Sequence, residues 1–338
     1  MTEESRSEAR LIELEDVHLA YRSGFFRRRL PVLRGISFSV TKGSIVGYLG
    51  VNGAGKTTTI KLLAGINRPD AGRLRVLGGS PESPETRNRV GFLPENPYFY
   101  EYLTPREALD FYARLHGLSQ ERRERQITEL LARVQLTAHA DAPVRGFSKG
   151  MRQRLGLAQA LVHDPELLIL DEPLTGLDPM GRLLLREIIL GEARAGRTVF
   201  FSSHVLSDVE AICDHLVIIN GGEIAFVGAR DELLRSSERG RALVRWREPE
   251  GATRPESLEA IPWLRGPESR PGGVEAEVAK ESGGAVLDAL RESGMELLEF
   301  RVLGGTLEEV FLERFGKELP GVTARRSTSA EAGEEAAA

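Results

Sequence analysis

The stretch SIVGYLGVNGAGKTTTIKLLAG at residues 44–65 combines two hydrophobic patterns on either side of a glycine-rich segment. Its beginning is rich in sheet-forming side chains, and its end carries apolar residues at helical spacing. Between them, residues 50–57 fit the pattern G-x-x-x-x-G-K-[ST]. The stretch therefore predicts a strand, a tight loop and a helix, which is the local unit of a mixed α/β fold.

The glycine-rich loop has the composition of a phosphate-binding site. Its glycines let successive backbone N–H groups point inward, and the helix that follows adds its positive N-terminal end. Lys56 supplies a charge to the β- and γ-phosphates of a nucleotide, and the Thr57 hydroxyl can coordinate Mg²⁺. The nucleotide-binding residues predicted in this loop are Asn52, Gly53, Ala54, Gly55, Lys56, Thr57 and Thr58.

Two carboxylates follow a second apolar run. Residues 167–170 (LLIL) have the continuous apolar character of a strand buried on both faces, and Asp171 and Glu172 come directly after them. The carboxyl end of a strand in a parallel sheet carries the ligand crevice. Asp171 is thus positioned to hold Mg²⁺, directly or through water, and Glu172 to polarise an attacking water. The alternative is an ordinary strand-to-loop exit, where acidic residues are common.

Composition narrows the class of protein. The chain has 338 residues, with 45 basic and 50 acidic side chains and a formal net charge of −5. This mildly acidic balance argues against nucleic acid as a partner, because non-specific nucleic-acid binding needs a basic surface. The single cysteine, Cys213, excludes an intrachain disulfide framework. No apolar run approaches the ~18 residues of a membrane-spanning helix, so we expect a cytoplasmic protein with a core large enough for an enzyme.

Local patterns divide the chain into parts. Residues 11–21 alternate as a half-buried strand does, and SGFFRRRLPVL at 23–33 interrupts that pattern, which predicts a hairpin turn with a basic tip. Capping boxes at Thr104–Glu107 and Thr306–Glu309 predict helix starts. The parts that we predict are a flexible N-terminus (1–10), a nucleotide-binding domain (11–235) with a helical subdomain (96–162), an α+β domain (236–316) with strands at 242–246, 274–279 and 297–302, and a disordered tail (317–338).

Further motifs occur in a characteristic order. Phe147-Ser148-Lys149-Gly150-Met151 looks like a signature sequence, usually LSGGQ, and Gly176-Leu177-Asp178 looks like a D-loop. His204, after FFSS, looks like a switch histidine, Tyr21 stands where an aromatic residue stacks on adenine, and Glu95 stands where most relatives have Gln. With the phosphate loop and the acidic pair, these motifs make about two-thirds of the chain resemble the nucleotide-binding subunit of ATP-binding cassette (ABC) transporters.

The form of these motifs is most similar to the ABC-2 exporter ATPases. This resemblance rests on Pro94-Glu95, on the Ser-Lys-Gly-Met form of the signature and on the ending LEEVFLERF. It implies an α/β P-loop ATPase core with an antiparallel β subdomain and a helical subdomain, followed by a small C-terminal α+β domain. It also implies ATP and Mg²⁺ as cofactors.

The resemblance assigns a role to each motif residue. Lys56, Glu172 and His204 are the catalytic residues that it implies, and Thr57, Glu95 and Asp171 are the metal ligands. Tyr21 would stack on adenine. Ser148, Lys149, Gly150 and Met151 would bind the γ-phosphate held by the opposite subunit, and Asp178 would bridge the two subunits. Lys149 and Met151 replace the usual Gly and Gln, and Lys149 either approaches the partner's nucleotide or points to solvent.

The partners follow from the same resemblance. One phosphate loop and one signature per chain imply a homodimer with two equivalent ATP sites. Without a spanning helix, the chain would act at the cytoplasmic face of the membrane on a separate ABC-2 type membrane subunit. The resemblance implies export of a drug, a lipid or polysaccharide, an ion or a motility-related substrate. The aromatic segment 97–102 is either the docking groove for that subunit or part of the helical subdomain's core. The alternative function is a soluble, non-transport ABC ATPase that acts on a macromolecular complex.

Overall fold

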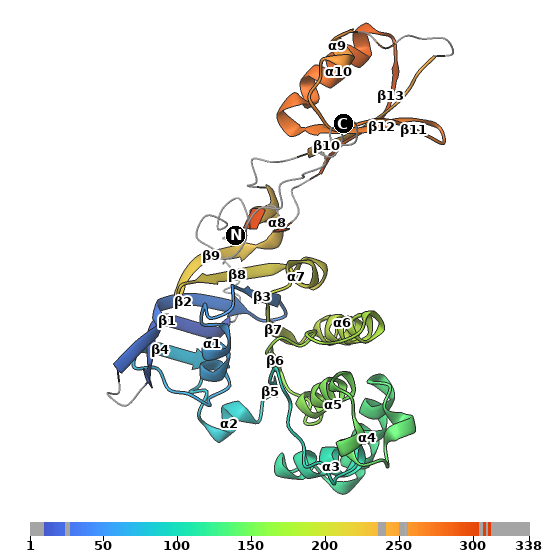
Figure 1. The fold of residues 1–338 in the computed structure, drawn as a ribbon. Coiled ribbons are helices and arrows are strands. Elements are labelled where there is room, and N and C mark those ends of the chain that lie inside the picture. Colours follow the sequence, from blue (N-terminus) through green and yellow to red (C-terminus); the bar gives the residue numbers. More distant parts are fainter. Residues whose placement is uncertain are drawn as a thin grey trace, which may run out of the picture. The chain divides into compact units, whose positions relative to one another are not determined.

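The computed structural model describes residues 10–23, 28–235, 241–249, 254, 256–303, 307–308 and 310–311. The chain divides into two compact units, Met1–Glu232 and Leu233–Ala338, which Figure 1 shows as ribbons. The predicted tail at 317–338 and the capping box at Thr306 and Glu309 lie outside the described residues. No helix of the described part of the chain is long and apolar enough to cross a membrane.

The centre of the first unit is a six-stranded sheet with the order β5-β6-β7-β3-β8-β9. Its strands are parallel except for β9, which pairs antiparallel with β8. All residues of β3 and β6 are buried, as their continuous apolar sequences predict. The bounds are β3 (Ile45–Leu49), β5 (Val90–Leu93), β6 (Leu167–Leu170), β7 (Thr198–Ser203), β8 (His215–Asn220) and β9 (Glu223–Ala229).

A second sheet is antiparallel and has the order β2-β1-β4, with bounds β1 (Arg10–Ser23), β2 (Arg28–Thr41) and β4 (Ala71–Val76). The predicted hairpin turn at 23–33 was too long, because Leu33 is buried opposite Leu19 and the ladder continues to Arg28. Pro31 is tolerated there because β2 is an edge strand, which needs no donor on its outer side. Residues 24–27, at the tip, lie outside the described residues.

Helix α1 (Lys56–Leu63) lies between the two sheets (Figure 1). Its Ile60, Leu62 and Leu63 belong to a core cluster that also contains buried residues of β1, β2, β3, β6, β7 and β8. Removing this apolar surface from water contributes roughly 1.5–3 kcal/mol for each large aliphatic side chain. The start of α1 is thereby held rigidly beside the carboxyl ends of the parallel strands.

Helices cover the other side of the central sheet (Figure 1). Thr104 and Glu107 form the predicted capping box at the start of α3, with both reciprocal hydrogen bonds present. The remaining bounds in this unit are α2 (Pro84–Arg87), α3 (Pro105–Leu115), α4 (Gln120–Arg133), η1 (Thr137–His139), η2 (Val144–Gly146), α5 (Lys149–Leu161), α6 (Pro179–Arg194), α7 (Leu206–Ile212) and α8 (Arg230–Arg235), the last of which ends in the second unit.

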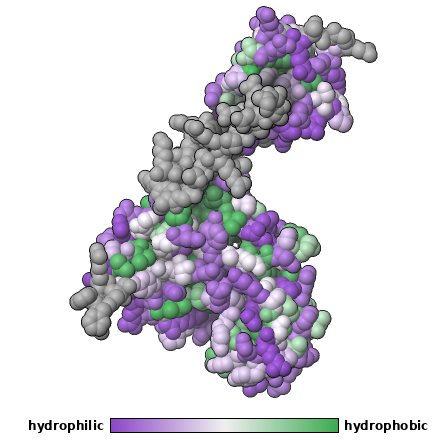
Figure 2. Space-filling view, viewed as in Figure 1, coloured by the Kyte–Doolittle hydropathy of each residue, from purple (hydrophilic) through white to green (hydrophobic). Residues whose placement is uncertain are grey.

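The second unit contains an antiparallel sheet with the order β11-β12-β10-β13. Trp246 is fully buried between the sheet and its helices, and hydrophilic residues cover most of the visible face (Figure 2). Strand β11 was missed in the sequence because it is an edge strand with few buried side chains. The bounds are β10 (Arg241–Arg247), α9 (Glu256–Glu259), β11 (Trp263–Arg270), β12 (Gly273–Ala279), η3 (Lys280–Ser282), α10 (Gly283–Glu292) and β13 (Glu296–Leu303).

Candidate functional site

The loop between β3 and α1 needs glycine at its last position. Gly55 has a φ of 114°, and a Cβ there would lie 2.8 Å from Leu33 Cδ2. No side chain caps the N-terminus of α1. The N–H groups of a helix's first turn have no partner within the helix, and they carry the positive end of its dipole. The loop and the helix therefore form a site suited to a phosphate group.

Lys56 is almost fully buried at the base of this loop. Its Nζ donates a hydrogen bond to the carbonyl of Gly50 at 2.7 Å and lies 3.7 Å from Glu172 Oε1. Burial lowers the pKa of Lys56, while the neighbouring carboxylates of Glu172 and Asp171 oppose that shift. A buried ammonium group beside a phosphate loop is well suited to pair with an incoming anion.

Asp171 and Glu172 are connected through a serine on the neighbouring strand. Ser202 Oγ donates to Asp171 Oδ1 at 2.7 Å and accepts the backbone N–H of Glu172 at 2.9 Å. Thr57 Oγ1 lies 3.5 Å from the same Asp171 oxygen. Burial raises the pKa of Asp171, and the hydrogen bonds from Ser202 and Thr57 oppose that rise. The acidic pair is thus held jointly by β6, β7 and α1.

Glu172 is the most constrained residue of the site. Its φ of 49° lies in the left-handed region, which costs a non-glycine residue about 1–3 kcal/mol. Its Oε2 accepts hydrogen bonds from His204 Nδ1 at 2.8 Å and from Thr175 Oγ1 at 3.1 Å. Because an ionised carboxylate only accepts hydrogen bonds, the imidazole proton in this contact belongs to Nδ1. The strained backbone and these donors orient the carboxylate.

These groups surround a cavity of about 360 Å³. Most of the residues that we predicted for the phosphate loop, for the catalytic base and for metal binding lie together on the wall of this cavity. Ala54 lies buried in the loop and Asp171 lies behind the wall, in contact with Thr57. The lining residues are Val32, Asn52, Gly53, Gly55, Lys56, Thr57, Thr58, Glu95, Glu172 and His204.

Tyr21 is not among the residues that line the cavity. It lies near the end of β1, is 41% exposed, and its hydroxyl accepts a hydrogen bond from Asn67 Nδ2 at 2.8 Å. A half-exposed ring remains available for stacking on a flat, apolar group. Its predicted contact with adenine stays a prediction.

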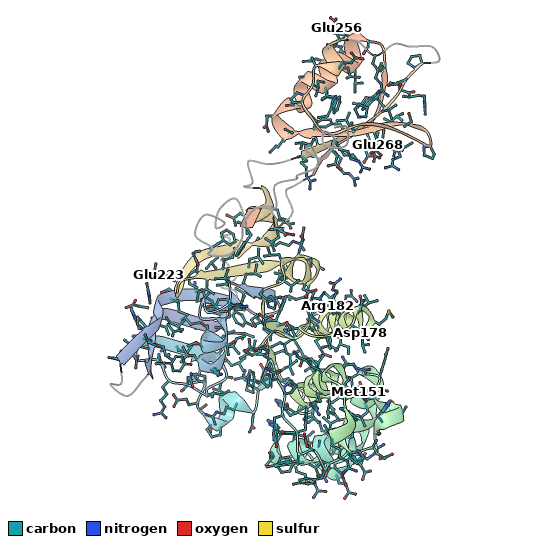
Figure 3. The ribbon with its side chains drawn as sticks, viewed as in Figure 1. Met151, Asp178, Arg182, Glu223, Glu256 and Glu268 are labelled. Carbon is teal, nitrogen blue, oxygen red and sulfur yellow. The ribbon has the colours of Figure 1, made fainter. Side chains whose placement is uncertain are left out.

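The signature residues form a separate cluster at the starts of two helices. Ser148 caps α5 by accepting the N–H of Met151 at 3.2 Å, and Asp178 caps α6 by accepting the N–H of Gly181 at 2.6 Å. Figure 3 shows Met151 and Asp178 on the helical side of the sheet. The Lys149 side chain lies over Gly176, where a Cβ would be 2.8 Å from Lys149 Nζ. Ser148, Lys149, Gly150, Met151 and Asp178 are all absent from the cavity lining.

Three contributing residues were not predicted from the sequence. Ser202 connects the two carboxylates, Thr175 binds Glu172, and Val32 forms part of the wall. The stretch FFSSH placed Ser202 two residues before the switch histidine, but only the pairing of β6 with β7 shows which hydroxyl faces the acidic pair. Thr175 follows Glu172 by three residues, a spacing at which a hydroxyl can fold back on a turn.

The oxygen donors near the cavity fit a hard divalent cation. Thr57 offers a hydroxyl, and Asp171 and Glu95 offer carboxylates. Mg²⁺ binds such oxygens through one or two carboxylates together with substrate phosphates, rather than in a cage built only from protein. The described residues contain no cluster of three or more histidine, cysteine or acidic side chains able to hold a metal.

The chain is similar to known proteins of one family. A family model described as "ABC transporter" matches residues 33–175. An ABC transporter ATP-binding protein of Nostoc sp. is 48% identical over 67% of this chain and 68% of its own length. The linearmycin resistance ATP-binding protein LnrL of Bacillus subtilis is 35% identical over 66% of this chain and 70% of its own length. A solved ATP-binding subunit of an ABC transporter, 34% identical, superimposes with a TM-score of 0.60 over 67% of this chain and 92% of that chain.

Proposed function

This chain belongs to the ABC transporter family, with the fold of its ATP-binding ATPase subunits, and we propose that two copies close around two ATP molecules to drive a separate membrane subunit. The observation that carries the proposal is the contact between Glu172 and His204, at 2.8 Å, beside the buried Lys56. This arrangement places a carboxylate, an imidazole and an ammonium group on the wall of one cavity.

The three side chains have complementary roles in hydrolysis. Glu172 orients the attacking water and accepts its proton, and Lys56 offsets the charge on the β- and γ-phosphates. An imidazole protonated at both nitrogens donates from Nδ1 to Glu172 and from Nε2 to a γ-phosphate oxygen. Hydrolysis thereby requires little rearrangement of His204, because the ring is already fixed against the base.

Mg²⁺ would be held by Thr57 and Asp171, with Glu95 in contact directly or through water. When bound, the ion neutralises charge that develops on the transferred phosphoryl group. Glu95 adds a negative charge where related proteins carry a neutral amide. The chain's own contribution is the hydrogen bond from Ser202, which opposes the rise in the pKa of Asp171 that burial causes.

A second copy of the chain would complete each site. The signature cluster lies outside the cavity of its own subunit, although Ser148 stands at the N-terminus of a 13-residue helix, where anions are favoured. In a two-fold dimer, the cluster of one copy can face the phosphate loop of the other. Departure of phosphate then removes the bridge and lets the dimer open.

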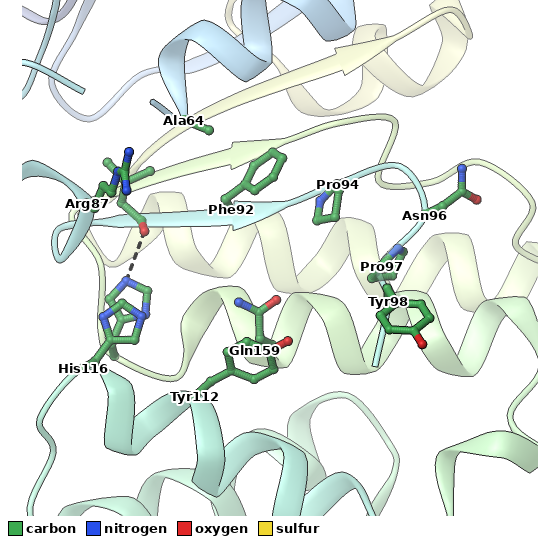
Figure 4. A pocket seen from close by; sticks show the side chains of 12 residues that line it. Ala64, Arg87, Phe92, Pro94, Asn96, Pro97, Tyr98, Tyr112, His116 and Gln159 are labelled. Atoms are coloured by element: carbon green, nitrogen blue, oxygen red, sulfur yellow. Dashed lines mark hydrogen bonds between the residues drawn. The ribbon is translucent and has the colours of Figure 1, made fainter. Parts of the chain in front are cut away.

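An aromatic surface supports docking of a membrane subunit. Tyr98 and Tyr102 are 78% and 72% exposed, whereas Phe99 between them is buried. A cavity of about 410 Å³ adjoins this segment and is partly lined by Pro97 and Tyr112 (Figure 4). Exposed aromatic residues beside a hollow are well suited to anchor a short helix of a partner. We infer that an ABC-2 type membrane protein binds here at the cytoplasmic face. The name of the relative LnrL, a linearmycin resistance protein, supports export as the direction of transport.

Hydrolysis and dimerisation are tested with Glu172→Gln. This variant should bind ATP, lose turnover and accumulate as an ATP-dependent dimer in sedimentation experiments, because the amide keeps the shape of the carboxylate but accepts no proton. Rapid turnover without such a dimer would refute the role of Glu172 as the base.

Docking is tested by co-purification of the tagged chain from its own cells. The chain should bring down a multi-spanning membrane protein, and Tyr98→Ala should weaken that association. Val227→Ala, at another exposed apolar residue of the same unit, is the matched control and should not. Recovery of a soluble macromolecular complex in place of the membrane protein would favour the non-transport alternative.

A further inference from the structure

The two edges of the sheet in the second unit differ in how they are protected. Strand β11 forms one edge and strand β13 the other. An exposed strand edge offers unpaired N–H and C=O groups to another strand, and proteins usually block it with proline, bulges or charges. The contrast between the two edges therefore indicates which of them is available for pairing.

Strand β11 carries several of these blocking features. Pro267 removes a donor, and the pairing with β12 shifts register twice between Trp263 and Glu268. Arg265 and Arg270 both bind Glu268, which fills the strand's surface with charge. This edge is poorly suited to accept a further strand.

Strand β13 carries fewer of these features: it has no proline, its pairing with β10 shifts register once, at Leu298, and its charges are Glu296, Glu299 and Arg301. It contains eight residues without proline or glycine, and within the described residues no strand pairs with its outer edge. Leu298 is 37% exposed and Val302 is 49% exposed, on a unit whose visible face is mostly hydrophilic (Figure 2). An edge strand without proline and with exposed aliphatic side chains can act as a template for another strand.

The sequence of β13 is complementary to itself in the antiparallel direction. If two copies pair with Phe300 opposite Phe300, then Glu299 of each lies opposite Arg301 of the other. Glu299 and Arg301 already contact each other within one strand at 3.4 Å. Across the two-fold axis, the four charges would alternate in sign around a square.

We propose that β13 pairs with β13 of a second copy, which joins two second units into one continuous eight-stranded sheet. This contact goes beyond the proposed closure around ATP, because none of its residues belongs to the nucleotide site and it needs no nucleotide. It would keep two copies together after hydrolysis, so that each closure begins from a tethered pair with a high effective concentration. It also assigns the second unit a role in holding the dimer.

Charge exchange on β13 tests the pairing in the full-length chain. Without nucleotide, sedimentation should show a dimer, and Glu299→Arg should raise its dissociation constant roughly tenfold or more, since two attractive contacts become repulsive. The double variant Glu299→Arg/Arg301→Glu should restore the dimer, because the charges are exchanged and remain complementary.

Glu275→Arg is the matched control. Glu275 and Glu299 flank the same Arg245, at 3.6 and 3.7 Å, but Glu275 lies on β12, an interior strand. Glu275→Arg should change the free energy of unfolding as much as Glu299→Arg does, and it should leave the dissociation constant of the dimer unchanged. The pairing would be overturned if the chain stays monomeric without nucleotide. It would also be overturned if Glu299→Arg and Glu275→Arg have the same dimer dissociation constant.

A disulfide measures the register directly. A mixture of Glu299→Cys and Arg301→Cys chains should form mixed dimers under oxidation, because directly opposed residues lie within disulfide reach. The native Cys213 does not interfere, since it is buried and burial raises the pKa of its thiol to about 12. Absence of the mixed disulfide would contradict this register. Loss of ATP-dependent dimerisation in Glu172→Gln would instead contradict the proposed function and leave this pairing standing.

Discussion

Replacing Ser202 with alanine tests whether one hydroxyl organises the acidic pair. The hydroxyl donates to Asp171 at 2.7 Å and accepts the N–H of Glu172 at 2.9 Å, and both contacts are buried. Its loss leaves one buried N–H unsatisfied and removes one donor from a carboxylate, each at a cost of about 1–3 kcal/mol. We therefore expect Ser202→Ala to lower the free energy of unfolding of the first unit by about 3 kcal/mol.

The same replacement should change the pH dependence of hydrolysis. The hydrogen bond from Ser202 favours the ionised form of Asp171 and opposes the rise in its pKa that burial causes. Without that bond the pKa of Asp171 rises further, and the carboxylate becomes protonated at a higher pH. The acid limb of the kcat/KM profile should therefore move to higher pH.

Thr198→Ala is the matched control for these measurements. Thr198 lies on the same strand and is also buried, but it accepts only the N–H of Gly43, at the opposite end of β7. In urea unfolding, Thr198→Ala should lower the free energy of unfolding about half as much as Ser202→Ala does, or by roughly 1–2 kcal/mol. The acid limb of its kcat/KM profile should not move. If both variants shift the limb equally, or neither does, Ser202 does not control the ionisation of Asp171.

Three other variants address separate parts of the first unit. Lys56→Ala should abolish ATP binding in a fluorescent-nucleotide titration, and unchanged affinity would refute the phosphate-loop assignment. Asp171→Asn should abolish Mg²⁺-dependent turnover yet stabilise the nucleotide-free protein at neutral pH by roughly 1 kcal/mol. Because the folded pKa of Asp171 is raised, its ionisation opposes folding, so this gain should fade in urea titrations as the pH falls below the ordinary aspartate pKa. Thr104→Ala removes a capping box and should cost about 1 kcal/mol of unfolding free energy, with ATP affinity unchanged.

Features encoded in contiguous residues were predictable from the sequence. The strand, loop and helix around Lys56 follow from a change in hydrophobic period across a run of glycines. The capping box of Thr104 needs only residues within one helical turn. The α/β class of the fold was confirmed, and the buried strands β3 and β6 follow from their continuous apolar sequences.

Features that depend on pairing between distant segments were not predictable. The role of Ser202 arises because Leu170 stands beside Phe201 in the parallel register, which no local pattern encodes. The extension of β2 back to Arg28 depends on burial of Leu33 opposite Leu19. Local signals at 23–33 favoured a turn, and the tertiary environment overrode them.

In the proposed mechanism, the contacts of Lys56 and Glu172 would let ATP binding prepare its own hydrolysis. Lys56 Nζ is shared between the loop carbonyl of Gly50 and Glu172 Oε1, at 2.7 and 3.7 Å. A phosphate bound in the loop competes for that ammonium group, and an ammonium that turns toward the phosphate leaves Oε1 without its cation. Oε2 remains fixed by His204 and Thr175. In this mechanism the released oxygen would be free to accept a proton from water in a carboxylate that is already oriented, so the proposed base would become available only when the phosphate is in place.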